Sequence, residues 1–161
     1  MRSGKAEPKT RSISNYGGEI NRRIVFAEAI PCLYYLCEKI LETGCTVLIV
    51  DDDPSHLKIY KWVLERGGFR PLPALVKRGL VDLPRGEHVD VAVVDYRLGA
   101  GLSAVDVAKG IRELYPSTPI LVLSDLFGMP EDIAPYAAAF VRKGEPQQLL
   151  DTIRETIKAA A

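Results

Sequence analysis

Short apolar runs that alternate with amphipathic stretches constrain the fold of this chain more than any other feature. The runs are CTVLIV (45–50), VDVAVV (89–94), PILVL (119–123) and AAFV (138–141), with a weaker one, FRPLP, at 69–73. Brief runs rich in β-branched residues are typical of buried parallel strands, and the stretches between them suit crossover helices. The pattern predicts an α/β fold with a five-stranded parallel sheet.

Helical spacing of apolar residues marks the connections between these strands. Helices are expected over 54–66, where Gly67 and Gly68 would stop the helix, and over 103–115, with a short crossover segment at 74–82. Ser103 followed by Asp106 is typical of a capping box at a helix start. A last helix begins at Pro146, with Leu149, Leu150, Ile153 and Ile157 along one face.

The first 43 residues differ in composition from the rest. Residues 1–18 form a polar tail, and residues 19–43 have helical spacing interrupted at Pro31. This helical extension would pack on the sheet domain, residues 44–161, or pair two copies in a homodimer. Cys32, Cys37 and Cys45 lack the spacing of a zinc site and are expected to be reduced core thiols.

Composition excludes several functional classes. Twenty-one basic and twenty-one acidic residues cancel, so the overall charge predicts neither a nucleic-acid partner nor a membrane partner. The polar N-terminus does not resemble a signal peptide, and the longest apolar stretch is too short to cross a bilayer. We expect a cytoplasmic protein whose function depends on a local site.

Polar side chains follow the predicted strands where those strands end. Three carboxylates, Asp51, Asp52 and Asp53, follow the first strand, and one residue or pair follows each of three others: Asp95, Ser124, and Arg142 with Lys143. The carboxyl ends of parallel strands meet at one edge of a sheet. Clustered carboxylates must protonate or find a cation, and Mg2+ prefers oxygen ligands. The edge therefore predicts a magnesium-assisted phosphoryl site with one carboxylate as nucleophile.

From about residue 45 to residue 157 the chain resembles the receiver domain of two-component response regulators. The resemblance rests on the acidic residues in VLIVDDDP, the acid ending VAVVD, the hydroxyl in PILVLS and the lysine in FVRK. Asp95 follows Asp51 by 44 residues, which agrees with the family's spacing. It implies a flavodoxin-like, doubly wound sheet with strand order 2-1-3-4-5.

The resemblance also implies the chemistry of phosphoryl transfer. Asp51 and Asp52 would position Mg2+ with the backbone carbonyl of Arg97, and Asp95 would accept a phosphoryl group. The donor would be a sensor histidine kinase or a histidine phosphotransfer protein in a phosphorelay. The chain would thus be no conventional enzyme, although it would catalyse its own aspartyl phosphorylation and dephosphorylation.

Further roles follow from the same resemblance. Lys143 would stabilise the transferred phosphoryl group, and Ser124 would bond it and move with Phe140 as a conformational switch. No organic cofactor is expected, because no Gly-rich phosphate loop follows the first strand. With only four residues after Ile157, we expect no output domain and signalling by contact with a downstream protein.

Three departures from the family pattern keep an alternative open. Asp125 stands where a small residue is usual, Gly144 replaces the proline after the lysine, and only 19 residues lead from Ser124 to Lys143. The connection between the last two strands is therefore expected to be short or irregular. The alternative is a receiver-like binding module that no longer switches.

Some polar residues near the site have simpler interpretations. Asp53 precedes Pro54 and is expected to cap a helix rather than bind an ion. His56 and His88 are expected to be surface or helix-start residues rather than ligands. Neither lies in residues 19–43, so that segment cannot be a histidine phosphotransfer helix.

Overall fold

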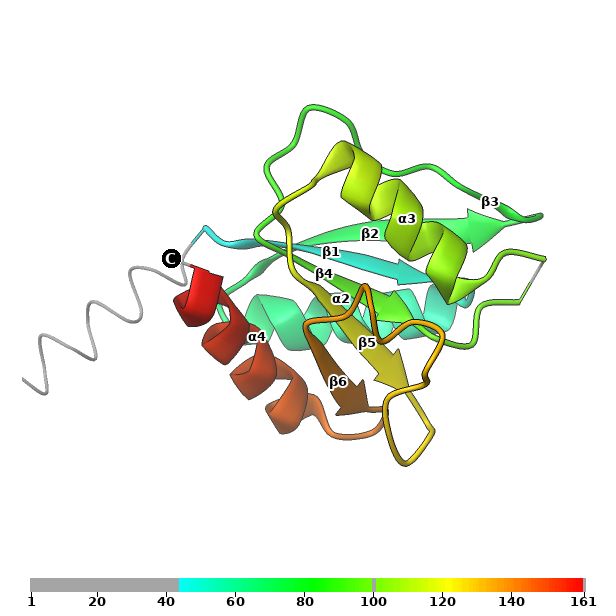
Figure 1. Ribbon diagram of the computed structural model, residues 1–161. Coiled ribbons are helices and arrows are strands. Elements are labelled where there is room, and N and C mark those ends of the chain that lie inside the picture. Colours follow the sequence, from blue (N-terminus) through cyan, green and yellow to red (C-terminus); the bar gives the residue numbers. More distant parts are fainter. Residues whose placement is uncertain (1–43, 100, 161) are drawn as a thin grey trace, which may run out of the picture. The chain divides into compact units, whose positions relative to one another are not determined.

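The computed structural model describes residues 44–99 and 101–160 (Figure 1). The predicted tail, the helical extension with its proposed dimer contact, Cys32 and Cys37 lie outside these residues.

The described residues form a flavodoxin-like α/β fold around a six-stranded sheet, which confirms the predicted fold class. The parallel strands are β1 (Thr46–Asp51), β2 (Arg70–Lys77), β4 (Val91–Asp95), β5 (Ile120–Ser124) and β6 (Ala139–Arg142). Their order is β2-β1-β4-β5-β6, the 2-1-3-4-5 order expected from the sequence. An additional antiparallel strand, β3 (Leu80–Val81), lies at the edge beside β2.

Helices cover both faces of the sheet (Figure 1). Helices α2 (Pro54–Arg66) and α4 (Pro146–Ala160) lie on one face, and α3 (Ala104–Leu114) lies on the other. Successive side chains of a strand point to opposite faces, so Val47 and Ile49 of β1 pack with the first face and Leu48 and Val50 with the second. Buried side chains on both faces explain why these strands are continuous apolar runs.

The helix starts follow the sequence signals. Asp53 caps α2, and its side chain accepts a hydrogen bond from the Ser55 backbone at 2.7 Å. Ser103 and Asp106 form the expected capping box at the start of α3. At the end of α2, Gly68 has φ +90°, a conformation that glycine adopts without strain.

The expectation of a crossover segment at 74–82 is wrong. Strand β2 continues to Lys77, and the chain then turns back into β3 as a hairpin. Arg78 and Gly79 form its two-residue loop and have φ values of 50° and 72°, positive at both positions as a type I′ turn requires. Alternating burial of Ala74 and Val76 stabilises the extended conformation against the sheet.

The connection between β5 and β6 contains turns rather than a helix, as its short length predicted. Ile133, which is fully buried, anchors residues 125–138 to the face that α3 covers. Arg112 of α3 donates to the backbone carbonyls of Pro116, Thr118 and Tyr136. The Tyr96 hydroxyl donates to Asp132 at 3.2 Å, so both apolar packing and hydrogen bonds from outside the segment hold it in place.

Candidate functional site

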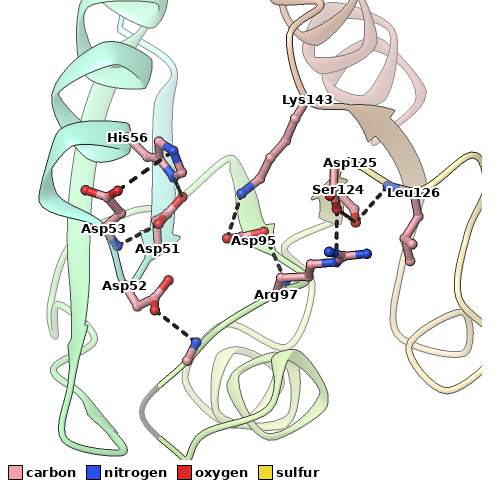
Figure 2. Close-up of polar contacts among 11 residues, drawn as sticks. Asp51, Asp52, Asp53, His56, Asp95, Arg97, Ser124, Asp125, Leu126 and Lys143 are labelled. Carbon is pink, nitrogen blue, oxygen red and sulfur yellow. Dashed lines mark hydrogen bonds and ion pairs between the residues drawn. The ribbon is translucent and has the colours of Figure 1, made fainter.

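The carboxyl ends of four parallel strands bring the predicted site residues to one edge of the sheet. Asp51 ends β1, Asp95 ends β4, Ser124 ends β5 and Lys143 follows β6. Figure 2 shows the side chains of Asp51, Asp95 and Lys143 pointing toward a common space between these strand ends. The ligand-binding edge expected of an open parallel sheet is therefore present.

Asp95 is buried and held by two donors. Only 3% of the residue is exposed, Oδ1 accepts from the Arg97 backbone N–H at 3.1 Å, and Oδ2 lies 2.8 Å from Lys143 Nζ. The Lys143 backbone in turn donates to the Ser124 carbonyl at 2.7 Å. The ammonium group thus balances the carboxylate charge and is fixed to the neighbouring strand.

Asp51 is the most deeply buried acid of the site, with 1% of the residue exposed. Its Oδ1 accepts from the Asp53 backbone at 2.8 Å, but its buried Oδ2 has no hydrogen-bond partner among the described residues. Burial, together with the charge of Asp95, raises the pKa of the Asp51 carboxyl, although the hydrogen bond from Asp53 opposes the shift. A divalent cation with oxygen ligands fits this carboxylate, because it would satisfy Oδ2 and favour the charged form.

The carboxylate of Asp52, unlike that of Asp51, is bonded to the loop after β4. Its Oδ2 accepts from the Gly99 backbone N–H at 2.9 Å. A Cβ atom on Gly99 would approach that oxygen to 2.7 Å, so a larger residue there would displace the Asp52 carboxylate. The carboxylate connects the loop after β4 to β1, and Asp52 is not in the group of closest possible ligands, which comprises Asp51, His56 and Asp95.

His56 is a site residue that sequence reasoning missed. It lies in the first turn of α2, as a helix-start residue should, but its ring faces the strand ends (Figure 2). Nδ1 is buried and lies 3.4 Å from Asp51 Oδ2, and Nε2 lies 3.9 Å from Asp53 Oδ2. The available signal was its position, five residues after Asp51 in a helix that starts at the strand end. His88 has an exposed side chain, paired with Asp90 at 3.0 Å.

Asp125 pairs with Arg97 beside the buried Ser124. Arg97 Nε lies 3.0 Å from Asp125 Oδ1, and the Ser124 hydroxyl lies 3.5 Å from the same oxygen. Figure 2 shows the Arg97 side chain reaching from the loop after β4 to the loop after β5. Arg97 thus balances the charge of Asp125, the residue that stands where a small one is usual, and the pair links the loops after β4 and β5.

Phe140, which was expected to move with Ser124, lies on the edge strand β6. Phe140 is a half-buried residue of β6 that packs toward the α3 face, and together with Phe127 and Arg142 it lines a cavity of about 590 Å³.

On the α2 side, burial and the charges of Asp51 and Asp95 raise the pKa of Tyr60 to about 12. The neutral phenol therefore persists across the physiological pH range.

The arrangement suits transfer of a phosphoryl group to a carboxylate. Asp95 is a potential nucleophile, Lys143 supplies a positive charge at the point of attack, and Asp51 offers an unsatisfied oxygen to a cation. Within residues 44–99 and 101–160, no helix has the length and apolar character needed to cross a membrane.

Characterised proteins match this chain over about half of its length. Over 79 residues the chain is 33% identical to the autoinducer 1 sensor kinase/phosphatase LuxN of Vibrio campbellii, a match that covers 49% of this chain and 9% of LuxN. Over 80 residues it is 34% identical to the transcriptional regulatory protein ZraR of Klebsiella oxytoca, covering 48% of this chain and 17% of ZraR. The chain therefore matches only a small part of each of these longer proteins.

Solved structures share the fold over the whole sheet domain. A CheY-like receiver domain protein from Methanospirillum hungatei has a TM-score of 0.60 and 22% identity, covering 72% of this chain and 95% of that one. The response regulator TrrA of Thermotoga maritima, solved in complex with Mg2+ and BeF, has a TM-score of 0.54 and 22% identity, covering 73% and 99%. The model of the protein family described as "Response regulator receiver domain" matches residues 47–154. This chain belongs to the response regulator receiver domain family.

Proposed function

We propose that this receiver domain accepts a phosphoryl group on Asp95 with the help of Mg2+ and signals by contact with a downstream protein. The observation that carries the proposal is the buried Asp95 carboxylate, 2.8 Å from the Lys143 ammonium and next to the unsatisfied oxygen of Asp51. Receiver domains work with histidine kinases or phosphotransfer proteins, which makes a phosphohistidine the natural donor. The Mg2+ and BeF complex of TrrA supports a similar site on this fold.

Each residue of the site has a separate role in the proposed phosphoryl transfer. The Asp95 carboxylate attacks phosphorus, the bond from phosphorus to the histidine nitrogen breaks, and an aspartyl phosphate forms. Lys143 remains beside the transferred group and stabilises its charge. Asp51, with the Arg97 carbonyl, would hold Mg2+, and Asp52, which accepts from the Gly99 N–H, would help to position the ion through water. The ion would supply positive charge to the phosphoryl oxygens.

The switch proposal concerns Ser124 and Phe140. The Ser124 hydroxyl, now 3.5 Å from Asp125, would turn to a phosphoryl oxygen once Asp95 is modified. Movement of the strand end would change the packing of half-buried Phe140 on β6, and so alter the surface that it shares with Phe127. Absence of nucleic-acid and membrane partners, and a cytoplasmic location, stay predictions.

Incubation with acetyl phosphate and Mg2+ tests the proposal directly. Intact mass measurement should show one added phosphoryl group on the wild-type chain and none on Asp95→Asn. Asp82→Asn, which changes an exposed aspartate outside the four strand ends that form the site, should be modified like the wild type. Failure of the wild-type chain under conditions that modify another receiver would refute phosphoacceptor function and favour the non-switching binding module.

A further inference from the structure

His56 and Asp51 each carry a buried polar atom, and the two atoms face each other. His56 Nδ1 and Asp51 Oδ2 are 3.4 Å apart, and neither atom has a hydrogen-bond partner in the part of the chain that the structure describes. An unsatisfied buried polar atom costs about 1–3 kcal/mol. One cation between them would satisfy both atoms.

The spacing of these atoms matches two ligands of one ion. Ligands about 2.1 Å from a metal lie about 3.0 Å apart at adjacent octahedral positions and about 3.4 Å apart in a tetrahedral site. Asp95 can add a third ligand atom, and the three residues offer atoms that all lie within 4.8 Å of one another. Figure 2 shows Asp51 between His56 and Asp95.

A second carboxylate, that of Asp53, lies near the ring of His56. Asp53 caps the helix on which His56 lies, and its Oδ2 is 3.9 Å from His56 Nε2 on the side of the ring away from Asp51. A carboxylate beside the second ring nitrogen is the usual outer partner of a metal-bound histidine. At 3.9 Å Asp53 forms no hydrogen bond with the ring, but it is close enough to accept one from Nε2 after a small movement of either side chain.

We propose that His56 Nδ1 is a metal ligand and that the site prefers a divalent first-row transition ion, such as Co2+ or Ni2+, over Mg2+. The inference rests on the acidic pocket of the proposed function and concerns the choice of ion there. Mg2+ selects oxygen ligands, whereas imidazole nitrogen suits transition ions. The competing explanation is an ion pair between a protonated His56 and Asp51, which needs no metal.

Metal titrations of the full chain separate these explanations. Trp62 is the only tryptophan, and it lines one cavity of about 480 Å³ together with His56, so its fluorescence reports on binding nearby. Wild-type protein, His56→Asn and His88→Asn are titrated with Co2+, Ni2+ and Mg2+, and the visible spectrum of bound Co2+ is recorded. His88→Asn is the matched control, because His88 has an exposed side chain and pairs with Asp90.

The wild type should bind Co2+ at least about tenfold more tightly than Mg2+, following the affinity order of nitrogen-containing sites. His56→Asn should weaken Co2+ binding by at least about tenfold, since loss of even an outer partner has that effect. Its Co2+ spectrum should also change, because a nitrogen ligand has left. His88→Asn should match the wild type in both measurements.

Equal Co2+ affinity and an unchanged Co2+ spectrum in His56→Asn would overturn the inference, as would tighter binding of Mg2+ than of Co2+ by the wild type. Phosphorylation of the wild type by acetyl phosphate is measured in parallel with Mg2+, with Co2+ and with Ni2+. Phosphorylation without an effect of His56 on Co2+ rejects the inference alone. Co2+ binding that depends on His56, without phosphorylation under any of the three ions, rejects the proposed function alone.

Discussion

Replacement of Asp51 by asparagine should stabilise the metal-free protein. The carboxylate is buried, and only Oδ1 has a hydrogen-bond partner in the described chain, the Asp53 backbone N–H. The asparagine side chain would keep that acceptor and replace the charged Oδ2 with a neutral amide group that can donate to His56 Nδ1. Relief of one unsatisfied buried oxygen is worth about 1–2 kcal/mol, which corresponds to roughly 4–8 °C in melting temperature for a domain of this size.

Divalent cations should stabilise the wild type but not Asp51→Asn. A ligand at about ten times its dissociation constant stabilises the folded state by about 1.4 kcal/mol. Saturating Mg2+, or the ion preferred at the site, should therefore raise the melting temperature of the wild type. It should not raise that of Asp51→Asn, because the carboxylate that the ion would satisfy is gone.

The pH dependence has a defined sign. Burial raises the pKa of Asp51 above its ordinary value of 3.8, so the folded state binds this proton more tightly than the unfolded state. The free energy of unfolding of the metal-free wild type should therefore fall as pH rises from about 3.8 through the raised pKa, and remain lower above it. The contribution of this group to the pH dependence should be absent from Asp51→Asn.

Thermal and urea unfolding with and without cation provide the assay. Asp82→Asn is the matched control, because Asp82 is exposed, and it should keep both the wild-type stability and the wild-type response to cation. A metal-free Asp51→Asn protein less stable than the wild type would refute the explanation, as would an undiminished response to cation.

Three further predictions follow. Lys143→Met should slow phosphorylation of Asp95 by acetyl phosphate about 100-fold, the scale for loss of one group that stabilises transition-state charge; an unchanged rate of modification by intact mass would contradict the role. Asp125→Ala should speed phosphorylation, because Ser124 loses a competing acceptor, and should change the free energy of unfolding in urea by less than about 1 kcal/mol, since its pair with Arg97 is exposed; slower modification would argue against this. Gly79→Val should lower the free energy of unfolding in urea by about 1–2 kcal/mol because φ is 72°, and Gly79→Asn should lower it less; equal losses would contradict the turn argument.

Most of the fold could be predicted because its signals are local. The apolar runs at strand positions, the cap at Asp53 and the capping box at Ser103 each depend on residues close together in the sequence. The hairpin after β2 was missed because Arg78–Gly79 lacks the Asn-Gly or Asp-Gly signature of such turns. Strand β2 tolerates Pro71 and Pro73 because neither has to donate a hydrogen bond to β1. The Arg70 N–H donates to the Cys45 carbonyl beside β1, so the nitrogens of the alternate residues 71 and 73 point away from β1.

The positions of the site residues at the strand ends could be predicted from the sequence. The contacts that the loops and α2 make there could not. Asp51, Asp95, Ser124 and Lys143 come together because parallel strands end at one edge, which follows from topology alone. The direction of a side chain on a neighbouring element does not follow from topology. The orientation of His56 and the pairing of Asp125 with Arg97 required the geometry of α2 and of two loops. The proposed roles of these residues still await the measurements above.

The turns at residues 125–138 give the domain a region of low local stability. Few backbone hydrogen bonds hold this segment, among them those donated by Ala134, Tyr136 and Ala137. Its release from the α3 face exposes Ile133, at about 1.5–3 kcal/mol, together with the partly buried Met129 and Tyr136. It also breaks the hydrogen bonds from Arg112 to the Tyr136 carbonyl and from the Tyr96 hydroxyl to Asp132, but it leaves the parallel strands paired. Amide hydrogens here should exchange by local opening while β4 and β5 stay closed, so a partner could capture this surface without unfolding the sheet.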